Sequence, residues 1–249
     1  AGIATMPSAK KASFRQEFNM FGRSFKSTLI LTAGAVALAG TPALADGDDH
    51  EEEHYDIAVW NDGGSLVTGG WDHDTESLEV ANLRVFEGHF GEDPEFPFAI
   101  DEPGIGGVAA DVGFDLGSTL QLNLVSGLGV WNGDGFSSSS SSIQIDYGPT
   151  SIDSTTGGLL DFLVIEDYDY HPIFTIDSGA PTGSYILEFT AQMDGMISSD
   201  SFWIVFNFGM DDELFEETVE WAEINLAPAP GALGLLAVGG LCGARRRRG

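Results

Sequence analysis

The chain has 249 residues, of which 39 are Asp or Glu and 10 are Lys or Arg, so its formal net charge at pH 7 is −29. The imbalance is greatest in residues 46–226, because nine of the ten bases and Glu17 lie outside them, leaving 38 acids against Arg84, a formal net of 1 − 38 = −37. Nucleic acid, anionic lipid and phosphorylated substrates are therefore disfavoured as partners, since this segment repels anions.

Two explanations for this acidity are open. Dense carboxylates keep a surface hydrated in salt water or brine, where high ionic strength screens their repulsion. Carboxylate oxygens are also the hard ligands that calcium uses, so divalent-cation binding is the second explanation.

Residues 1–45 are expected to be an upstream extension and a signal peptide rather than part of the folded domain. From Met20 onward the chain carries a basic segment, an apolar run and an A-x-A cleavage motif: Arg23 and Lys26, Thr28–Ala39, and Ala43-Leu44-Ala45. This order is typical of a secreted protein. Cleavage after Ala45 makes Asp46 the expected mature N-terminus.

Residues 46–56 (DGDDHEEEHYD) are an acidic run that we expect to be a solvated arm. Residues 50–54 match the zinc protease motif H-E-x-x-H. That chemistry needs both histidines on one face of a half-buried helix, and the arm has no apolar face, so no protease is predicted. His50 and His54 are instead candidate ligands for adventitious Zn, Ni or Cu.

Residues 57–226 are predicted to be one all-β domain, an antiparallel β-sandwich or jelly roll. About ten short apolar runs are separated by turn residues, and several alternate as a strand with one buried face does. The expected strands are Ile57–Trp60 and Ser65–Thr68 in a hairpin, then 80–86, 112–116, 119–125, 128–131, 143–147, 159–165, 173–176, 185–193 and 202–208. The single cysteine, Cys242, lies outside this domain, so no disulfide can stabilise it.

One amphipathic helix is predicted over residues 211–223. Asp211, Asp212 and Glu213 favour a helix N-terminus, and apolar residues then recur at helical spacing up to Trp221 and Ala222. We expect this helix to lie against the β domain through Phe215 and Trp221.

Three D-x-D triplets are candidate calcium sites, since each could give two carboxylates to one ion. One lies in the arm, at Asp46 and Asp48; the two in the β domain offer Asp72 with Asp74, and Asp167 with Asp169. None of the triplets extends to an EF-hand loop. Trp71 and Trp131, flanked by Gly and Asp, are candidates for exposed rings that stack on sugars. Ser137–Ser142 lacks a G-x-S-x-G context and is expected to be a flexible loop.

Residues 227–249 contain a Pro-Ala-Pro hinge, an apolar run and a basic end: Pro228, Ala229 and Pro230, then Ala232–Cys242, then Arg245, Arg246, Arg247 and Arg248. The apolar run can form a short membrane helix with the arginines on the cytoplasmic side. This layout resembles the PEP-CTERM sorting signal of Gram-negative envelope proteins, with Ala229 where that signal usually has Glu. The resemblance implies processing by an exosortase-type protease and only a transient stay in the inner membrane; the alternative is a retained membrane anchor.

Parts of the β domain are similar to a group of PEP-CTERM proteins of unassigned role. The matching segments are Asp56-Ile57 with Gly70, the Asp101-Glu102-Pro103-Gly104 turn, Val130–Phe136 and Ser201–Gly209. The resemblance implies an exported β-sandwich without catalytic residues. That group tends to carry paired histidines before a mid-chain strand, whereas this chain has Tyr170-His171, so no shared histidine site is predicted.

The sequence thus predicts a non-enzymatic protein of the cell surface or extracellular matrix. The first alternative is a calcium-dependent carbohydrate-binding module for extracellular polysaccharide. The second is a secreted hydrolase, which needs paired carboxylates facing a sugar cleft.

Overall fold

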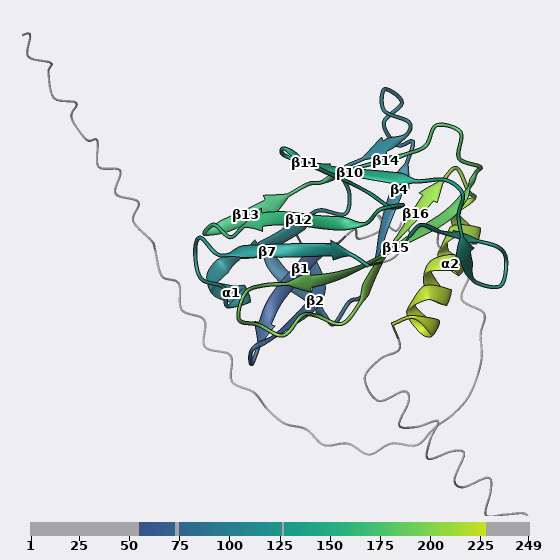
Figure 1. Ribbon diagram of the computed structural model, residues 1–249. Helices are drawn as coiled ribbons and strands as arrows, with labels where there is room; N and C mark the ends of the chain where they lie inside the picture. The colour runs from purple at the N-terminus through teal and green to yellow at the C-terminus, as the bar shows by residue number, and fades with distance from the viewer. Residues whose placement is uncertain (1–54, 73–74, 126, 228–249) are drawn as a thin grey trace, which may run out of the picture. The chain divides into compact units, whose positions relative to one another are not determined.

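The structure is a computed structural model that describes residues 55–72, 75–125 and 127–227 (Figure 1). The predicted signal peptide, most of the acidic arm and the sorting tail lie outside these residues, and with them the predicted site residues Ala43, Ala45, His50, His54, Asp74, Pro228, Ala229, Pro230 and Arg245–Arg248.

Strands dominate the described part of the chain. They are β1 (Asp56–Asp62), β2 (Ser65–Asp72), β3 (Ser77–Ala81), β4 (Val85–Phe90), β5 (Ala99–Ile100), β6 (Ile105–Val108), β7 (Thr119–Leu124), β8 (Gly129–Trp131), β9 (Phe136–Ser138), β10 (Ile143–Tyr147), β11 (Thr150–Asp153), β12 (Gly158–Leu163), β13 (Asp167–Tyr170), β14 (Ile173–Ile176), β15 (Gly183–Gln192) and β16 (Phe202–Phe208). The helices are the single turn α1 (Ala109–Val112) and α2 (Asp212–Asn225).

The strands form three sheets, named here by one strand of each. The β1 sheet has the order β13-β6-β1-β2-β3, the β10 sheet has the order β11-β10-β14-β5, and the β15 sheet has the order β12-β7-β15-β16-β4. The β8–β9 hairpin joins the β15 sheet through pairing of β8 with β15. The predicted all-β class and the predicted hairpin of β1 and β2 are confirmed.

The β1 and β15 sheets are mixed, so the prediction of purely antiparallel pairing is wrong, and only the β10 sheet is antiparallel throughout. β4 pairs in parallel with β16 from Val85↔Trp203 to Phe90↔Phe208, and β1 pairs in parallel with β6 at Ile57↔Ile105. Parallel neighbours need a long crossover connection. Most of the domain lies between β4 and β16 in the sequence and provides one, which an inspection of local turns does not reveal.

One face of each sheet contributes to a common apolar core. Ile57 of β1, Ile145 of β10 and Phe189 of β15 are each no more than 1% exposed and belong to the same cluster of buried side chains. The alternating apolar residues of β7 and β10 point into this core, as the sequence pattern predicts: Leu120, Leu122, Leu124, Ile143 and Ile145.

Strand β16 is buried on both faces, which explains its continuous apolar run. Phe202, Ile204 and Phe206 face the common core, whereas Trp203 and Val205 pack against α2. Figure 1 shows α2 beside β15 and β16, and it contacts β16 and β4. Its buried residues are Phe215, Thr218, Val219 and Ala222, which confirms the predicted helix and its packing through Phe215.

Two other predicted strands are wrong. Residues 112–116 are not a strand, because the turn α1 ends at Gly113 in the left-handed conformation, with φ of 71°. Residues 80–86 are divided between β3 and β4, and Asn82 with φ of 65° makes the break. A left-handed residue cannot continue a strand, so apolar spacing alone misplaces both segments.

Strands β5, β6, β9, β11 and β13 are absent from the predictions. β9 takes up Ser137 and Ser138, so the serine run is not wholly a loop. β6 is rich in glycine, and its glycines are covered by aromatic rings: a Cβ on Gly106 would lie 2.2 Å from Cδ1 of Trp71, and one on Gly107 would lie 2.6 Å from the hydroxyl of Tyr168. Glycine here permits close packing of side chains on a strand.

We expect Gly106→Ala to lower the free energy of unfolding by about 1–3 kcal/mol or more, because the added methyl group overpacks the site under Trp71. Gly179→Ala is the matched control, since nothing lies within 4 Å of its Cβ position, and a slight gain of up to about 1 kcal/mol is expected there. Urea unfolding of both variants measures the difference; equal midpoints would show that β6 tolerates a side chain at residue 106.

Candidate metal centre

Three segments of the β1 sheet bring a histidine and carboxylates together. Asp56 begins β1, Glu102 lies in the loop between β5 and β6, and Asp169 and His171 lie at the end of β13. β6 runs between β1 and β13, and Ile105 of β6 is the register partner of both Ile57 and Tyr170. The residues next to these partners therefore meet around Gly104. We call Asp56, Glu102, Asp169 and His171 the Asp56 cluster.

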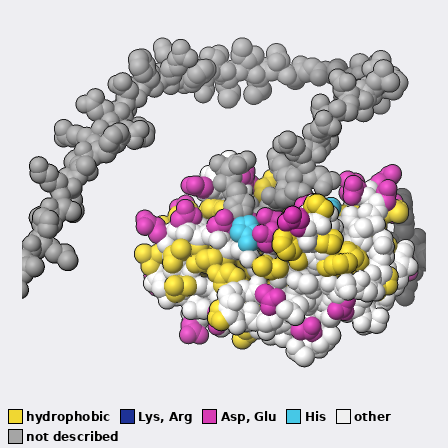
Figure 2. Space-filling view, turned by 90° about the horizontal axis from the view of Figure 1, so that it is seen from above, with side chains coloured by type: hydrophobic (Ala, Val, Ile, Leu, Met, Phe, Trp, Pro, Cys, Tyr) yellow, Lys and Arg dark blue, Asp and Glu magenta, His cyan; other side chains and the backbone are white. Residues whose placement is uncertain are grey.

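His171 is at the centre of the Asp56 cluster. Its Nε2 lies 2.8 Å from Oδ1 of Asp169. Its Nδ1 lies 3.1 Å from the carbonyl oxygen of Asp101 and 3.5 Å from Oε1 of Glu102. One ligand atom each from Asp56, Asp169 and His171 can be chosen so that all lie within 4.8 Å of one another. Figure 2 shows a face of the molecule on which histidine lies among acidic side chains.

The carboxylate of Asp56 is buried, with the residue only 1% exposed. The backbone N–H of Gly104 donates a hydrogen bond to Oδ1 of Asp56 at 2.5 Å, and its distance to Oε2 of Glu102 is 3.2 Å. A Cβ on Gly104 would lie 2.8 and 2.9 Å from the two carboxylate oxygens of Asp56 and 2.9 Å from Cε1 of His171. Glycine is therefore required for these side chains to approach so closely.

Trp71 forms an apolar wall next to Asp56. The two residues are register partners across β1 and β2, so their side chains share one face of the sheet. The indole covers Gly106 and is 3% exposed. The prediction that Trp71 is an exposed ring for sugar stacking is therefore wrong, because the missing side chain of Gly106 lets the indole pack inward.

The local environment changes the acidity of Glu102 and His171. Burial and then the neighbouring Asp56 raise the pKa of Glu102 to about 7. Burial by itself lowers the pKa of His171, but the carbonyl of Asp101 and the carboxylates of Glu102, Asp169 and Asp56 outweigh it and raise the pKa. Repulsion between neighbouring carboxylates favours the protonated form of Glu102, and attraction to the carboxylates favours the charged imidazolium of His171.

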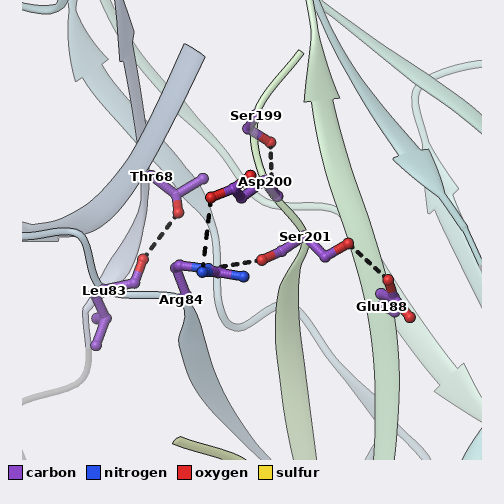
Figure 3. Close-up of polar contacts among 7 residues, drawn as sticks. All are labelled: Thr68, Leu83, Arg84, Glu188, Ser199, Asp200 and Ser201. Atoms are coloured by element: carbon purple, nitrogen blue, oxygen red, sulfur yellow. Dashed lines mark hydrogen bonds and ion pairs between the residues drawn. The ribbon is translucent and has the colours of Figure 1, made fainter. Parts of the chain in front are cut away.

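Arg84, the one basic residue between 46 and 226, is bound elsewhere (Figure 3). Its Nε donates a hydrogen bond to the carbonyl oxygen of Ser201 at 2.8 Å, and its Nη1 lies 3.8 Å from Oδ2 of Asp200. Its guanidinium also lies 5.3 Å from the ring centroid of Trp203. Arg84 thus links the start of β4 to the start of β16. Positive charge for the Asp56 cluster must therefore come from His171 or from an ion.

Of the predicted metal ligands that the structure describes, only Asp169 belongs to the Asp56 cluster. Asp167 is exposed two residues earlier on β13, and Asp72 accepts a hydrogen bond from the N–H of Thr75. Trp131 is half-buried, with its ring centroid 5.3 Å from Phe136 and 5.7 Å from Trp221. Its sugar-stacking role stays a prediction.

Sequence reasoning did not identify Asp56, Glu102 and His171 as site residues. Asp56 was assigned to the acidic arm, although an acid directly before the buried run Ile57–Val59 was an available signal. Glu102 and His171 could not be joined to it, because β6 and β13 were not predicted as strands and no local motif spans such distances along the chain.

No family model, no curated protein and no solved structure matches this chain. In the part of the chain that the structure describes, no helix has the length and apolar character needed to cross a membrane.

With chelator present, we expect the free energy of unfolding to fall as pH rises from about 4.5 to about 7. Glu102 keeps its proton in the folded state up to about pH 7 but loses it near 4.5 when unfolded, so its stabilising contribution is present at low pH and lost as pH rises. The raised pKa of His171 acts in the same direction.

Chemical unfolding of the full chain at a series of pH values tests this. Glu102→Gln should flatten the dependence on pH, whereas Glu95→Gln, which removes one charge from an exposed loop, should leave it parallel to that of the wild type. If the Glu102→Gln profile also parallels the wild type, Glu102 does not carry the linkage.

Proposed function

We propose that this protein is an exported, non-enzymatic component of the cell surface or extracellular matrix, whose β domain binds a divalent cation at the Asp56 cluster. The observation that carries the cation proposal is the meeting of ligand atoms from Asp56, Asp169 and His171 within 4.8 Å, with Glu102 in contact with the same histidine. Carboxylate oxygens and imidazole nitrogen are common metal ligands.

The charge of the cluster favours a cation. A nearly buried carboxylate such as Asp56 is costly unless it is balanced, and Asp169 adds further negative charge. Arg84 is bound to Ser201 and cannot balance them. A divalent ion would supply two positive charges where the carboxylates of Asp56 and Asp169 meet the ring of His171.

The position of the cluster gives a cation a structural role. Its residues come from the start of β1, the loop before β6 and the end of β13, which are far apart in the sequence. An ion bound there would hold these segments together in the folded state alone. Such binding stabilises the fold by mass action, by roughly 2.7 kcal/mol at a hundredfold excess over the dissociation constant.

Export and sorting are proposed from the two ends of the sequence. The A-x-A motif at Ala43 and Ala45 supports secretion, and the tail with Pro228, Pro230 and four arginines supports recognition by an exosortase-type protease during a transient stay in the inner membrane. The three sheets around a common core are compatible with the β-sandwich that the sequence predicts. Burial of Trp71 weakens the carbohydrate-binding alternative, since it removes one of the two proposed stacking rings.

Thermal melts of the full chain in chelator, and then with Ca²⁺, Mg²⁺, Mn²⁺ or Zn²⁺ at matched high NaCl, test cation binding. We expect at least one divalent ion at micromolar concentration to raise the midpoint by several degrees, because about 1 kcal/mol corresponds to about 2–4 °C in a domain of this size. Asp169→Asn should abolish the rise.

Asp167→Asn is the matched control, because it removes the same charge from the same face of β13 two residues away. It should retain the rise. Equal losses in the two variants would mean that the ions act on the general surface charge and not on the Asp56 cluster.

Cell fractionation tests export and sorting in a Gram-negative host that carries exosortase. We expect the full chain to reach the outer surface or the medium with both ends removed. Replacing Arg245–Arg248 with serine should leave the protein in the periplasm or inner membrane, because the basic end that stops translocation is lost. Mass spectrometry of the mature termini measures both cleavages; a wild-type chain found intact in the cytoplasm would contradict the proposal.

A further inference from the structure

We infer that the Asp56 cluster selects a divalent transition-type ion that accepts imidazole, with Zn²⁺ as the representative, over calcium. This inference rests on the proposed cation site and concerns only the class of ion. It departs from the calcium expected at the D-x-D triplets of the sequence.

The first argument is the orientation of the His171 ring. The carbonyl oxygen of Asp101 can only accept a hydrogen bond, so the Nδ1 that lies 3.1 Å from it carries a hydrogen and donates. In a neutral imidazole the Nε2 atom then carries no hydrogen and presents a lone pair. This lone pair faces the carboxylate of Asp169 at 2.8 Å. A proton on Nε2 satisfies this contact as an imidazolium–carboxylate pair, and a metal ion that binds both atoms takes the place of that proton.

The same hydrogen bond is the arrangement expected around a metal-binding histidine. Histidine ligands commonly donate their second ring N–H to a backbone carbonyl or carboxylate, which fixes the ring and the tautomer. Asp101 supplies that carbonyl to His171, and Glu102 lies at 3.5 Å from the same nitrogen. Nε2 is therefore held in place as the coordinating atom.

The second argument is the donor set. Calcium takes six to eight oxygen ligands in a flexible shell, whereas imidazole suits zinc and related transition ions. In the Asp56 cluster the nitrogen of His171 is one of the three atoms that converge within 4.8 Å, together with oxygens of Asp56 and Asp169. Ligands of a tetrahedral zinc lie roughly 3.3 Å apart, given Zn–N and Zn–O distances of about 2.0–2.2 Å. Zinc binding therefore requires the 2.8 Å contact of His171 with Asp169 to open and the more distant ligand atoms, within 4.8 Å, to close around the ion.

The third argument is the space beside these atoms. Gly104 has no side chain where a Cβ would come within 2.9 Å of the Asp56 carboxylate and of the His171 ring. The backbone N–H of Gly104 also donates to Asp56, which orients that carboxylate. The glycine thus keeps the convergence point of the cluster free of protein atoms, and its N–H acts as an outer partner of a ligand.

Calorimetric titration of the chelator-treated full chain with Zn²⁺, Mn²⁺ and Ca²⁺ tests the inference. We expect Zn²⁺ to bind at one site with at least about 100-fold higher affinity than Ca²⁺. His171→Asn should weaken Zn²⁺ binding by more than the roughly 10–100-fold that loss of an outer partner costs, while leaving weak Ca²⁺ binding unchanged. Zinc X-ray absorption should detect a nitrogen ligand at about 2.0–2.1 Å that disappears in this variant.

The double variant His50→Asn/His54→Asn is the control, because the acidic arm carries the one closely spaced histidine pair of the sequence. It should keep the high-affinity zinc site. If the double variant loses the site and His171→Asn keeps it, the ion binds the arm and the inference is wrong. If Ca²⁺ binds the Asp56 cluster more tightly than Zn²⁺, as judged by loss in Asp169→Asn, the choice of ion is wrong while the proposed cation site stands. If no ion binds in an Asp169-dependent way, both fail.

Discussion

The absence of side chains at Gly104, directly before β6, and at Gly106 and Gly107 within it is the constraint on which this domain depends. Gly104 admits the carboxylate of Asp56 and the ring of His171, Gly106 lies under the indole of Trp71, and Gly107 lies against the phenol of Tyr168. Successive residues of a strand point to opposite faces, so β6 is packed closely on both faces.

Because of this close packing, one face of β6 contacts the common core and the other face contacts the Asp56 cluster. Tyr168 is 2% exposed and belongs to the common core, whereas its neighbour Asp169 on β13 contacts His171 on the other face. Trp71 closes the side of the cluster next to Asp56, and this apolar wall accounts for the burial of a charged group at the start of β1. Side chains on β6 would push all of these groups apart.

Local patterns predicted the elements that have one buried face or a strong end signal. The alternation of Leu120, Leu122 and Leu124 gave β7, and the acids before Phe215 gave α2 to within two residues at its C-terminal end. β6 and β13, which bring the Asp56 cluster together, have no such pattern, because two of the four residues of β6 are glycine and Asp167-Tyr168-Asp169 in β13 resembles a polar loop. The cluster itself depends on parallel pairing of β1 with β6, a contact between distant segments that turn chemistry does not determine. The predicted exposure of Trp71 is wrong for the same reason, since the burial of its ring depends on Gly106 and not on its own neighbours in the sequence.

Burial distinguishes Asp56 from the exposed acids of the domain. Carboxylates such as Asp167 and Glu95 are exposed to solvent, where salt screens charges over about 8–10 Å, so they fit the proposed adaptation to high ionic strength. Asp56 is 1% exposed, and salt screens a buried charge far less. Its burial costs free energy at any ionic strength and adds nothing to surface hydration. Adaptation to brine therefore concerns the exposed carboxylates and not the buried Asp56, whose charge must be balanced locally, by the His171 imidazolium or by the cation proposed above.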